Sequence, residues 1–369
     1  MSPEQLVSSR NMAPEVHEHP TSGITVLPIL TELLPFPLPL LKRIQFHHRS
    51  PASRILATFP ATSEHIVHDT RDSIPKCFAV AFLDRTRRPE TECWLFLSGE
   101  ILGRCALSSS SKRCVECQEA LIAVIKALRA SDVPESIHDE AALIEANPHM
   151  ARALRGEVLL IGSLNEACYN ILQATMPEVI IPPPIRGIDE GWIKYIFRPS
   201  ALPESAQLAD GFRWGSVQPK DFELVRNRTS IPRTDATLSL LPSLAVFRSD
   251  EVDSPPVAWA FLGPDGSLTS LHTEIECRGR GLAKLLVAKL FGGSNFSPRT
   301  QRASDDVSKP GVDGSASWFH ADTGVDNASS RAVCRALGGT EGWLVYWTRI
   351  DTNKRGSFHQ THRACGDTE

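Results

Sequence analysis

The chain lacks a continuous apolar stretch long enough to cross a bilayer, which takes about 20 residues. Its most apolar early segment, 24–41, is interrupted by Pro28, Pro35, Pro37 and Pro39. The polar residues 1–21 also lack the apolar core of a secretory signal peptide. We therefore expect no membrane partner and a cytoplasmic location, with the nucleus as the alternative.

An excess of positive charge and a regular cysteine spacing are absent as well. The formal net charge of -4 and the pI near 6.3 give no general attraction to nucleic acid, which we do not expect as a partner. The nine cysteines are odd in number and irregularly spaced, which favours a reducing compartment over a disulfide framework. Cys114 and Cys117 have CxxC spacing, but no second pair or zinc-finger histidine pair follows. We interpret them as ordinary cysteines at a helix start and expect no metal.

The composition is otherwise that of a folded protein with two domains. Hydrophobic residues make up 41% of the 369 residues, which is enough for a core, and the length exceeds one average domain. The prolines at 182–184 form a stiff segment that suits a boundary. The predicted division is a disordered lead (1–25), an N-terminal α/β half (26–182), a linker (183–210), a second domain (211–351) and a polar tail (352–369).

Both halves combine strands and helices. In the first half, strand patterns are followed by an amphipathic helix over 114–129, a helix over 138–154, a strand over 158–161 and a helix over 165–173. In the second half, a helix over 218–227 precedes strands over 243–247, 257–262 and 268–273. The polar stretch 292–317 is expected to be a flexible insertion, and a strand, a helix and a final strand follow it. The fold class is therefore α/β (α+β).

The most informative segment is the one after the predicted strand 268–273. It reads Glu-Cys-Arg-Gly-Arg-Gly-Leu-Ala over 276–283 and runs into an apolar helix. A glycine-bearing turn before a helix leaves backbone N–H groups without partners, and the helix dipole adds positive potential, so a pyrophosphate fits there. The segment is neither the GxGxxG of a dinucleotide fold nor a P-loop.

This segment resembles the acyl-CoA signature of the GNAT superfamily of N-acyltransferases. The pattern is Gln or Arg, two residues, Gly, one residue, then Gly or Ala, which Arg278, Gly281 and Ala283 match. Downstream, Asn327 opens a helix that closes on Leu337 and Gly338, similar to the GNAT segment whose Asn lies near the pantetheine arm. Within the superfamily, residues 256–259, 272–282 and Trp343 are most similar to the glycine N-acyltransferase type.

The resemblance implies two GNAT-like halves, each a mixed, mostly antiparallel sheet flanked by helices. It also implies a site for acetyl-CoA or another acyl-CoA. The cofactor-binding residues would be Leu271, His272, Thr273, Arg278, Gly279, Arg280, Gly281, Leu282, Ala283 and Asn327. Asn327 also suits a helix N-cap, and the two roles are compatible.

The sequence departs from the family at the two positions expected to move protons. Cys334 stands where many GNAT enzymes have a Tyr that protonates the departing thiolate, and a buried structural cysteine is the alternative. Ser267 stands where glycine N-acyltransferases have a Glu as base. His272 and Glu274 remain as candidates, because alternation along the strand places them on one side together with Glu276.

The expected function is direct acyl transfer from acyl-CoA to an amine. The acyl group would be acetyl or another short chain, and the resemblance implies an amino acid or small-molecule amine as acceptor. The alternative is a catalytically vestigial CoA-binding GNAT module with a regulatory or scaffolding role, which the residues at 267 and 334 motivate.

Overall fold

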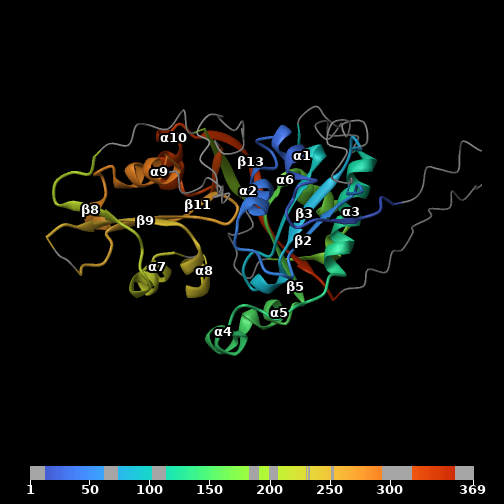
Figure 1. The fold of residues 1–369 in the computed structure, drawn as a ribbon, viewed down its shortest axis with the longest axis horizontal. Helices are drawn as coiled ribbons and strands as arrows, with labels where there is room; N and C mark the ends of the chain where they lie inside the picture. Colours follow the sequence, from blue (N-terminus) through green and yellow to red (C-terminus); the bar gives the residue numbers. More distant parts are fainter. Residues whose placement is uncertain are drawn as a thin grey trace, which may run out of the picture.

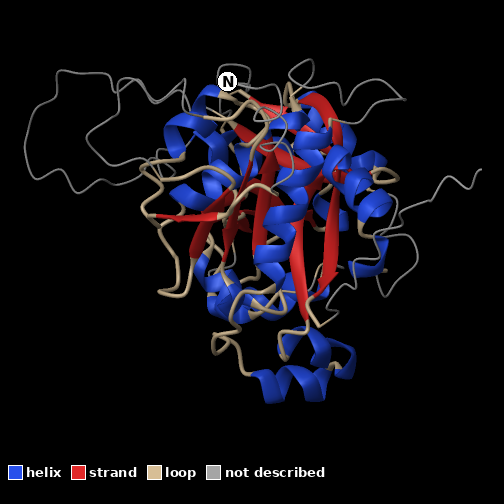
Figure 2. Cartoon of the chain, turned by 90° about the vertical axis from the view of Figure 1, so that its right-hand side faces the viewer, coloured by secondary structure: helices blue, strands red, loops and turns tan. Residues whose placement is uncertain are grey.

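The computed structural model describes residues 13–61, 74–101, 114–182, 191–198, 207–229, 231, 233–250, 253–292 and 318–353. These residues form one continuous twisted sheet with helices on both faces (Figures 1 and 2). The predicted insertion 292–317 lies, apart from Gly292, outside the described residues, as do 1–12 of the lead and 354–369 of the tail. No described helix is both long and apolar enough to span a bilayer.

The chain contains the same order of elements twice. The first copy consists of β1 (His17–His19), α1 (Leu27–Glu32), α2 (Leu38–Gln45), β2 (Arg54–Ala57), β3 (Ala79–Leu83), β4 (Cys93–Leu97), α3 (Val115–Arg129), β5 (Val158–Asn165), α6 (Glu166–Thr175) and β7 (Trp192–Phe197). The second copy consists of β8 (Phe212–Gly215), α7 (Phe222–Asn227), α8 (Asp235–Leu240), β9 (Ser243–Arg248), β10 (Ala258–Leu262), β11 (Ser267–Thr273), α9 (Leu282–Gly292), β12 (Phe319–Gly324), α10 (Ala328–Ala336) and β13 (Thr340–Asp351). The first copy also carries α4 (Glu140–Ala146), α5 (Ala151–Leu154) and the short β6 (Ile180–Ile181).

The two copies exchange their last strands. The sheet order is β1-β2-β3-β4-β5-β13-β7-β12-β11-β10-β9-β8. Thus β13, which ends the second copy, pairs with β5 of the first, and β7, which ends the first copy, pairs with β12 of the second. Both strands also pair with each other, so the centre of the sheet belongs to both halves.

This exchange corrects the predicted domain limits. β7 lies within the segment predicted as a linker (183–210), and β1 lies within the predicted disordered lead (1–25). β1 extends the sheet as an edge strand on β2. His19 Nε2 donates to the Phe59 carbonyl at 2.8 Å, and its Nδ1 makes a hydrogen bond with Thr25 Oγ1 at 2.8 Å. Short polar strands of this kind have no strong sequence pattern, since the partner strand determines them.

Alternation along the strands produces four core layers. In the first half, α3 and α6 cover one face of the sheet, and α1 and α2 cover the other. In the second half, α9 and α10 pack on Ala258, Ala260 and Leu262, whereas α7 and α8 pack on Trp259 and Phe261. Figure 1 shows α9 and α10 on the opposite side of the sheet from α7 and α8.

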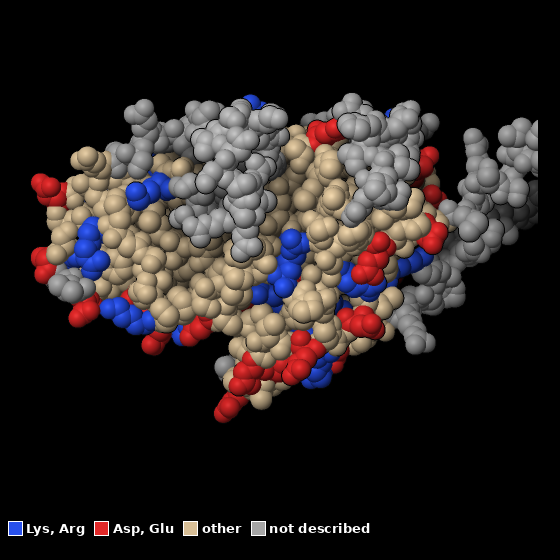
Figure 3. All heavy atoms as spheres, viewed as in Figure 1, with Lys and Arg blue, Asp and Glu red and all other residues tan. Residues whose placement is uncertain are grey.

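Helices α1 and α2 are a further difference from the sequence prediction. Pro28 and Pro39 lie in the first turns of α1 and α2, where their missing N–H groups are not needed, whereas Pro35 and Pro37 lie between the two helices. The predicted helix over 138–154 is in turn split into α4 and α5 at Pro148. α4 and α5 project from the body, and their side of the molecule carries acidic side chains in Figure 3.

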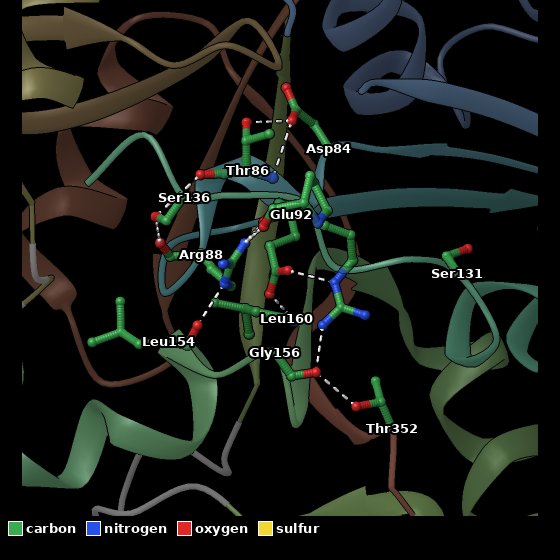
Figure 4. Close-up of polar contacts among 12 residues, drawn as sticks. Asp84, Thr86, Arg88, Glu92, Ser131, Ser136, Leu154, Gly156, Leu160 and Thr352 are labelled. Atoms are coloured by element: carbon green, nitrogen blue, oxygen red, sulfur yellow. Dashed lines mark hydrogen bonds and ion pairs between the residues drawn. The ribbon is translucent and has the colours of Figure 1, made fainter. Parts of the chain in front are cut away.

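The charged turn between β3 and β4 is buried rather than solvated. Arg85 and Glu92 form an ion pair of 2.9 Å, and both side chains are at most 2% exposed. Arg85 also donates to the Gly156 carbonyl, which accepts a second bond from Thr352 at the end of β13 (Figure 4). Arg88 donates to the Leu154 carbonyl of α5. This network fixes the α5 segment and the end of the exchanged strand to the first half.

Candidate functional site

Strands β11 and β12 separate soon after they begin. They pair in parallel only at Ser267–His320 and Leu268–Ala321, although β11 continues to Thr273. A bulge distorts the β10–β11 pairing, and Ser270 there has φ of 51°. The residues of β11 beyond Leu268 are therefore partly exposed, and one edge of the strand faces an opening in the sheet.

The side chains along this opening include buried polar atoms that make no hydrogen bond to the described residues. Ser270 Oγ, His272 Nε2 and Thr273 Oγ1 are buried and make no hydrogen bond within the described part of the chain. Burying such atoms costs free energy unless a partner is supplied. Three such atoms on one short strand make this edge a candidate site for a ligand that supplies hydrogen-bond partners.

His272 is held by the strand on which it lies and by the neighbouring one. It pairs with Trp259 of β10, and the two rings stack with centroids 4.7 Å apart. Its Nε2 lies 3.6 Å from Glu274 Oε2. Partial burial lowers the pKa of His272, against the opposing effect of Glu274. The imidazole is therefore neutral near pH 7 and has a lone pair available to accept a proton.

Glu274 is paired rather than free. Arg228, which follows α7, donates from Nε to both carboxylate oxygens, at 3.0 and 3.3 Å. The strand ends before Glu276, which lies exposed in the 3₁₀ turn Ile275–Cys277, so Glu276 does not share the strand face with His272 and Glu274 as predicted. Glu274 is thus placed to orient His272 and to neutralise Arg228.

The predicted pyrophosphate turn connects this strand to α9. Gly279 and Gly281 have φ of 75° and 78°, a conformation that other residues rarely adopt, and no atom lies within 4 Å of the position of a Cβ on either. The backbone N–H groups of Gly281, Leu282 and Ala283 have no acceptor among the described residues. The start of an 11-residue helix therefore presents open donors beside open space.

The two arginines of the turn differ in their contacts. Arg278 donates from Nε to the Thr273 carbonyl and so closes the turn onto the end of β11. Arg280 is exposed, with its guanidinium 5.9 Å from the centroid of the Phe212 ring. Arg280 is the better placed of the two to contact a phosphate from solvent. Leu271 and Leu282 belong to the apolar layer under α9, with Leu282 only 3% exposed.

The predicted residues of α10 lie at its start and on its buried face. Asn327 is the N-cap, since its side chain accepts from the Ser330 N–H at 3.0 Å. Cys334 is 2% exposed and packs in the same core layer as Leu286. Burial raises the pKa of the Cys334 thiol to about 12, with a smaller contribution from the charge of Asp322. A thiol with this pKa is a weak acid.

Ser267, the residue in place of the expected base, takes part in the β10–β11 turn. Its N–H and Oγ both donate to Asp265 Oδ1, at 3.1 and 2.6 Å. The other carboxylate oxygen of Asp265 accepts from Trp94 Nε1 of the first half. Ser267 thus stabilises the hairpin and the contact between the halves.

The corresponding strand of the first half is closed. Every residue of β4 is buried, whereas β11 is partly exposed along most of its length. At the end of β4, the Glu100 carboxylate accepts from the Leu97 N–H and from the Cys168 thiol of α6. Among the described residues, the last strand of the meander is therefore fully buried in the first half and partly exposed in the second.

A hollow of about 280 Å³ among the described residues lies elsewhere, between α6 and β13. It is lined in part by Tyr169, Tyr346 and Arg349, and by none of the predicted site residues. The rings of Tyr169 and Tyr346 are stacked 4.2 Å apart at its wall.

Comparison with known proteins agrees with this architecture. Residues 13–195 match the family model of the acyl-CoA N-acyltransferase verG N-terminal domain. Each half has a meander, a helix, a parallel strand, a second helix and a final strand. The matched region is therefore similar to an acyl-CoA N-acyltransferase domain, and the chain has the expected fold class, a mixed, mainly antiparallel sheet flanked by helices. No curated sequence gave a significant match.

Several solved structures resemble this chain at low sequence identity. A Drosophila protein is 13% identical, with a TM-score of 0.54, and the match covers 92% of this chain and 99% of that one. A tandem GNAT protein from the clavulanic acid biosynthesis pathway is 10% identical, with a TM-score of 0.42 and coverage of 93% and 99%. A GCN5-related N-acetyltransferase from Sphaerobacter thermophilus is 11% identical, with a TM-score of 0.42 and coverage of 91% and 95%.

Sequence patterns do not indicate all the residues around the opening. Ser270 is recognised from its positive φ at the bulge. Arg228 is recognised from its ion pair with Glu274, which lies 46 residues later in the sequence. Arg233, which donates to Thr269 Oγ1 at 3.3 Å, has a buried Nε without a partner. None of the three belongs to a recognisable motif, because the bulge and the packing of the loops beside α7 and α8 bring them to β11.

Proposed function

We propose that the second half binds acyl-CoA and transfers its acyl group directly to an amine. The observation that carries the proposal is the open edge of β11, with unpartnered polar side chains, leading into a glycine turn with open N–H donors. The GNAT fold supports the reaction class. The acceptor is an amino acid or a small-molecule amine, following the resemblance of 256–259 and 272–282 to the glycine N-acyltransferase type.

In this proposal, the turn and β11 hold the two ends of the cofactor. The N–H groups of Gly281, Leu282 and Ala283 and the Arg280 guanidinium bind the pyrophosphate. Leu271, His272 and Thr273 line the path of the arm and acyl group, and Asn327 contributes beside its capping role. Bound acyl-CoA supplies an activated thioester, whose acyl group moves from sulfur to the amine nitrogen while CoA leaves as the thiol.

His272 is the proposed base. Neutral near pH 7, it accepts the proton that the amine loses, and Glu274 positions it. Cys334 stays a candidate for the proton donor to the thiolate, but its raised pKa and burial weigh against that role. Solvent is the competing donor.

Calorimetric titration with acetyl-CoA tests the binding step. Gly281→Glu places a carboxylate at the turn and is expected to abolish binding. Gly211→Glu is the matched control, because Gly211 also has a positive φ, of 86°, and no atom within 4 Å of a Cβ position, but lies before β8, outside the proposed turn. Loss of binding in both variants, or in neither, contradicts the assignment of the turn.

Thiol release across a panel of amines and acyl chains then tests catalysis. Release that depends on one amine, with the acylated product found by mass spectrometry, supports the enzyme and names its acceptor. Binding of CoA without turnover for any pair would instead support the vestigial module.

A further inference from the structure

Three cysteines of the first half converge although only two are close in sequence. Cys77 lies two residues before β3, Cys114 is the N-cap of α3, and Cys117 lies one turn into that helix. Their Sγ atoms are all within 4.8 Å of one another, and those of Cys77 and Cys114 are 3.5 Å apart. Cys117 is fully buried, and the other two are partly exposed.

This spacing fits the coordination of one thiophilic metal ion. Zinc–thiolate bonds of about 2.3 Å in a tetrahedral site place neighbouring sulfurs about 3.8 Å apart. Small side-chain rotations bring the three sulfurs from their present positions to that distance. Residues i and i+3 lie on the same side of a helix, so Cys114 and Cys117 present both thiols to Cys77.

A potential fourth ligand of the correct kind lies beside one of the three thiols, that of Cys114. The Glu116 carboxylate accepts from Cys114 Sγ at 3.2 Å, and its Oε2 can replace that hydrogen bond with a metal bond when the thiol loses its proton. Three thiolates and a carboxylate around a divalent cation have an excess of negative charge. The N-terminal end of the 15-residue α3 and the neighbouring Lys76 offset it.

The position of the cluster in the repeat is informative. α3 follows β4 as α9 follows β11, so the cluster lies at the helix start that corresponds to the proposed pyrophosphate turn. Glu116 in the first turn of α3 is anionic and would repel a phosphate there, whereas Arg280 before α9 attracts one. The two helix starts are therefore suited to opposite charges.

We propose that Cys77, Cys114 and Cys117, with Glu116, form a structural binding site for a thiophilic divalent cation of the Zn²⁺ type. The bound ion would join the start of α3 to the start of β3, with release of the thiol protons. This proposal is an alternative to the interpretation of Cys114 and Cys117 as ordinary cysteines. The third ligand lies 37 residues earlier, where no spacing rule would reveal it.

Titration of the full-length, reduced and chelator-treated protein with Co²⁺ tests the site. One Co²⁺ per chain is expected, with the near-ultraviolet thiolate-to-cobalt charge-transfer absorption and the visible bands of tetrahedral coordination, and Zn²⁺ should displace it. Cys77→Ala and Cys117→Ala should each weaken Co²⁺ binding by more than about 100-fold. Loss of a direct ligand should exceed the effect of losing a residue that only hydrogen-bonds to a ligand, which reaches about 100-fold. Glu116→Gln should shift the visible bands while the charge-transfer absorption remains.

Cys168→Ala is the matched control, since Cys168 is buried in the same core layer but outside the cluster. It should bind Co²⁺ as the wild type does. The wild-type spectrum decides the question even if a variant fails to fold. Absence of charge-transfer absorption in the reduced wild type overturns the proposal, and a Cys77–Cys114 disulfide found by non-reducing mass spectrometry in that case identifies a redox pair instead.

Discussion

His272 of β11 stacks on Trp259 of β10 with ring centroids 4.7 Å apart and an angle of 26° between the planes. The stack fixes the imidazole next to the opening between β11 and β12, and partial burial lowers its pKa. This pair determines the geometry and the protonation state of the proposed base. Its substitution therefore gives the sharpest test of catalysis.

His272→Ala is expected to lower kcat by about 10²- to 10⁴-fold, the usual contribution of a general base, while acetyl-CoA binding persists. Because the base must be neutral, wild-type kcat/KM should fall on the acid side with an apparent pKa below the ordinary histidine value of about 6.5. Trp259→Phe keeps an aromatic ring under the imidazole and should retain most of the activity. Stopped assays across pH measure both effects, and an unchanged rate in His272→Ala excludes the residue as base.

Glu274→Gln tests whether this carboxylate acts through His272. Glu274 opposes the lowering of the pKa of His272, so its removal should move the acid limb of the rate profile to lower pH. Glu276→Gln is the control, because Glu276 is exposed and lies beyond the strand. A uniform loss of rate without a shift in the profile would mean that Glu274 only supports the fold around Arg228.

Cys334→Ala separates a donor role from a packing role. With a pKa of about 12, the thiol is a poor donor to a thiolate whose own acid has a pKa near 8.5, so we expect turnover to persist and the melting temperature to fall. Thiol-release kinetics and thermal melts make the comparison. A large loss of kcat in a protein of normal melting temperature would assign the donor role to Cys334.

Glu100 predicts a pH dependence of stability. Burial raises the pKa of this carboxyl to about 8, so the folded state binds its proton more tightly than the unfolded chain does. The contribution of this proton to the free energy of unfolding is fully present below the pKa of Glu100 in the unfolded chain, about 4.5. It is lost as pH rises through the folded-state pKa of about 8, by at most about 1.4 kcal/mol per pH unit. Glu100→Gln should remove this component. Urea unfolding at pH 5, 7 and 8.5 should show that the free energy of unfolding depends less on pH in Glu100→Gln than in the wild type. Parallel pH dependences in the two proteins would contradict the prediction.

Asp322 connects β12 to the exchanged strand β7 and to β5 of the first half. This side chain of β12 accepts from Lys194 of β7 at 2.7 Å and from Ser163 of β5 at 2.9 Å, and its pKa lies well below the ordinary value because Lys194 and His320 outweigh the effect of burial. Asp322→Asn leaves the Lys194 ammonium buried with a neutral partner and should cost about 3–5 kcal/mol. The double variant Lys194→Met/Asp322→Leu should recover most of the stability that Asp322→Asn loses, because it removes both buried charges.

Differential scanning calorimetry can detect the coupling of the halves through the same strands. We expect one cooperative transition in the wild type, because β7 and β13 each complete the other half's sheet. Two separate transitions would show that the exchanged strands contribute little to stability.

Local patterns in the sequence determined much of this protein. The helix 115–129, the meander 243–273 and the glycine turn before α9 were predictable, because apolar periodicity, turn residues and a motif are all encoded within short segments. Asn327 was predictable as an N-cap for the same reason, and the structure confirms the cap. The mixed α/β fold class also followed from such patterns, whereas the expectation of two GNAT-like halves came from the resemblance to that superfamily.

Only the tertiary structure decided the features that depend on contacts between distant segments. The exchange of β7 and β13 could not be predicted, since both neighbours of a strand are chosen by packing rather than by its own residues. The same holds for the buried charges around Arg85 and for the approach of Cys77 to Cys114 and Cys117. Most of all, the sequence contains two helix starts after two meanders, and only the fold shows that β4 is fully buried while β11 is partly exposed along most of its length.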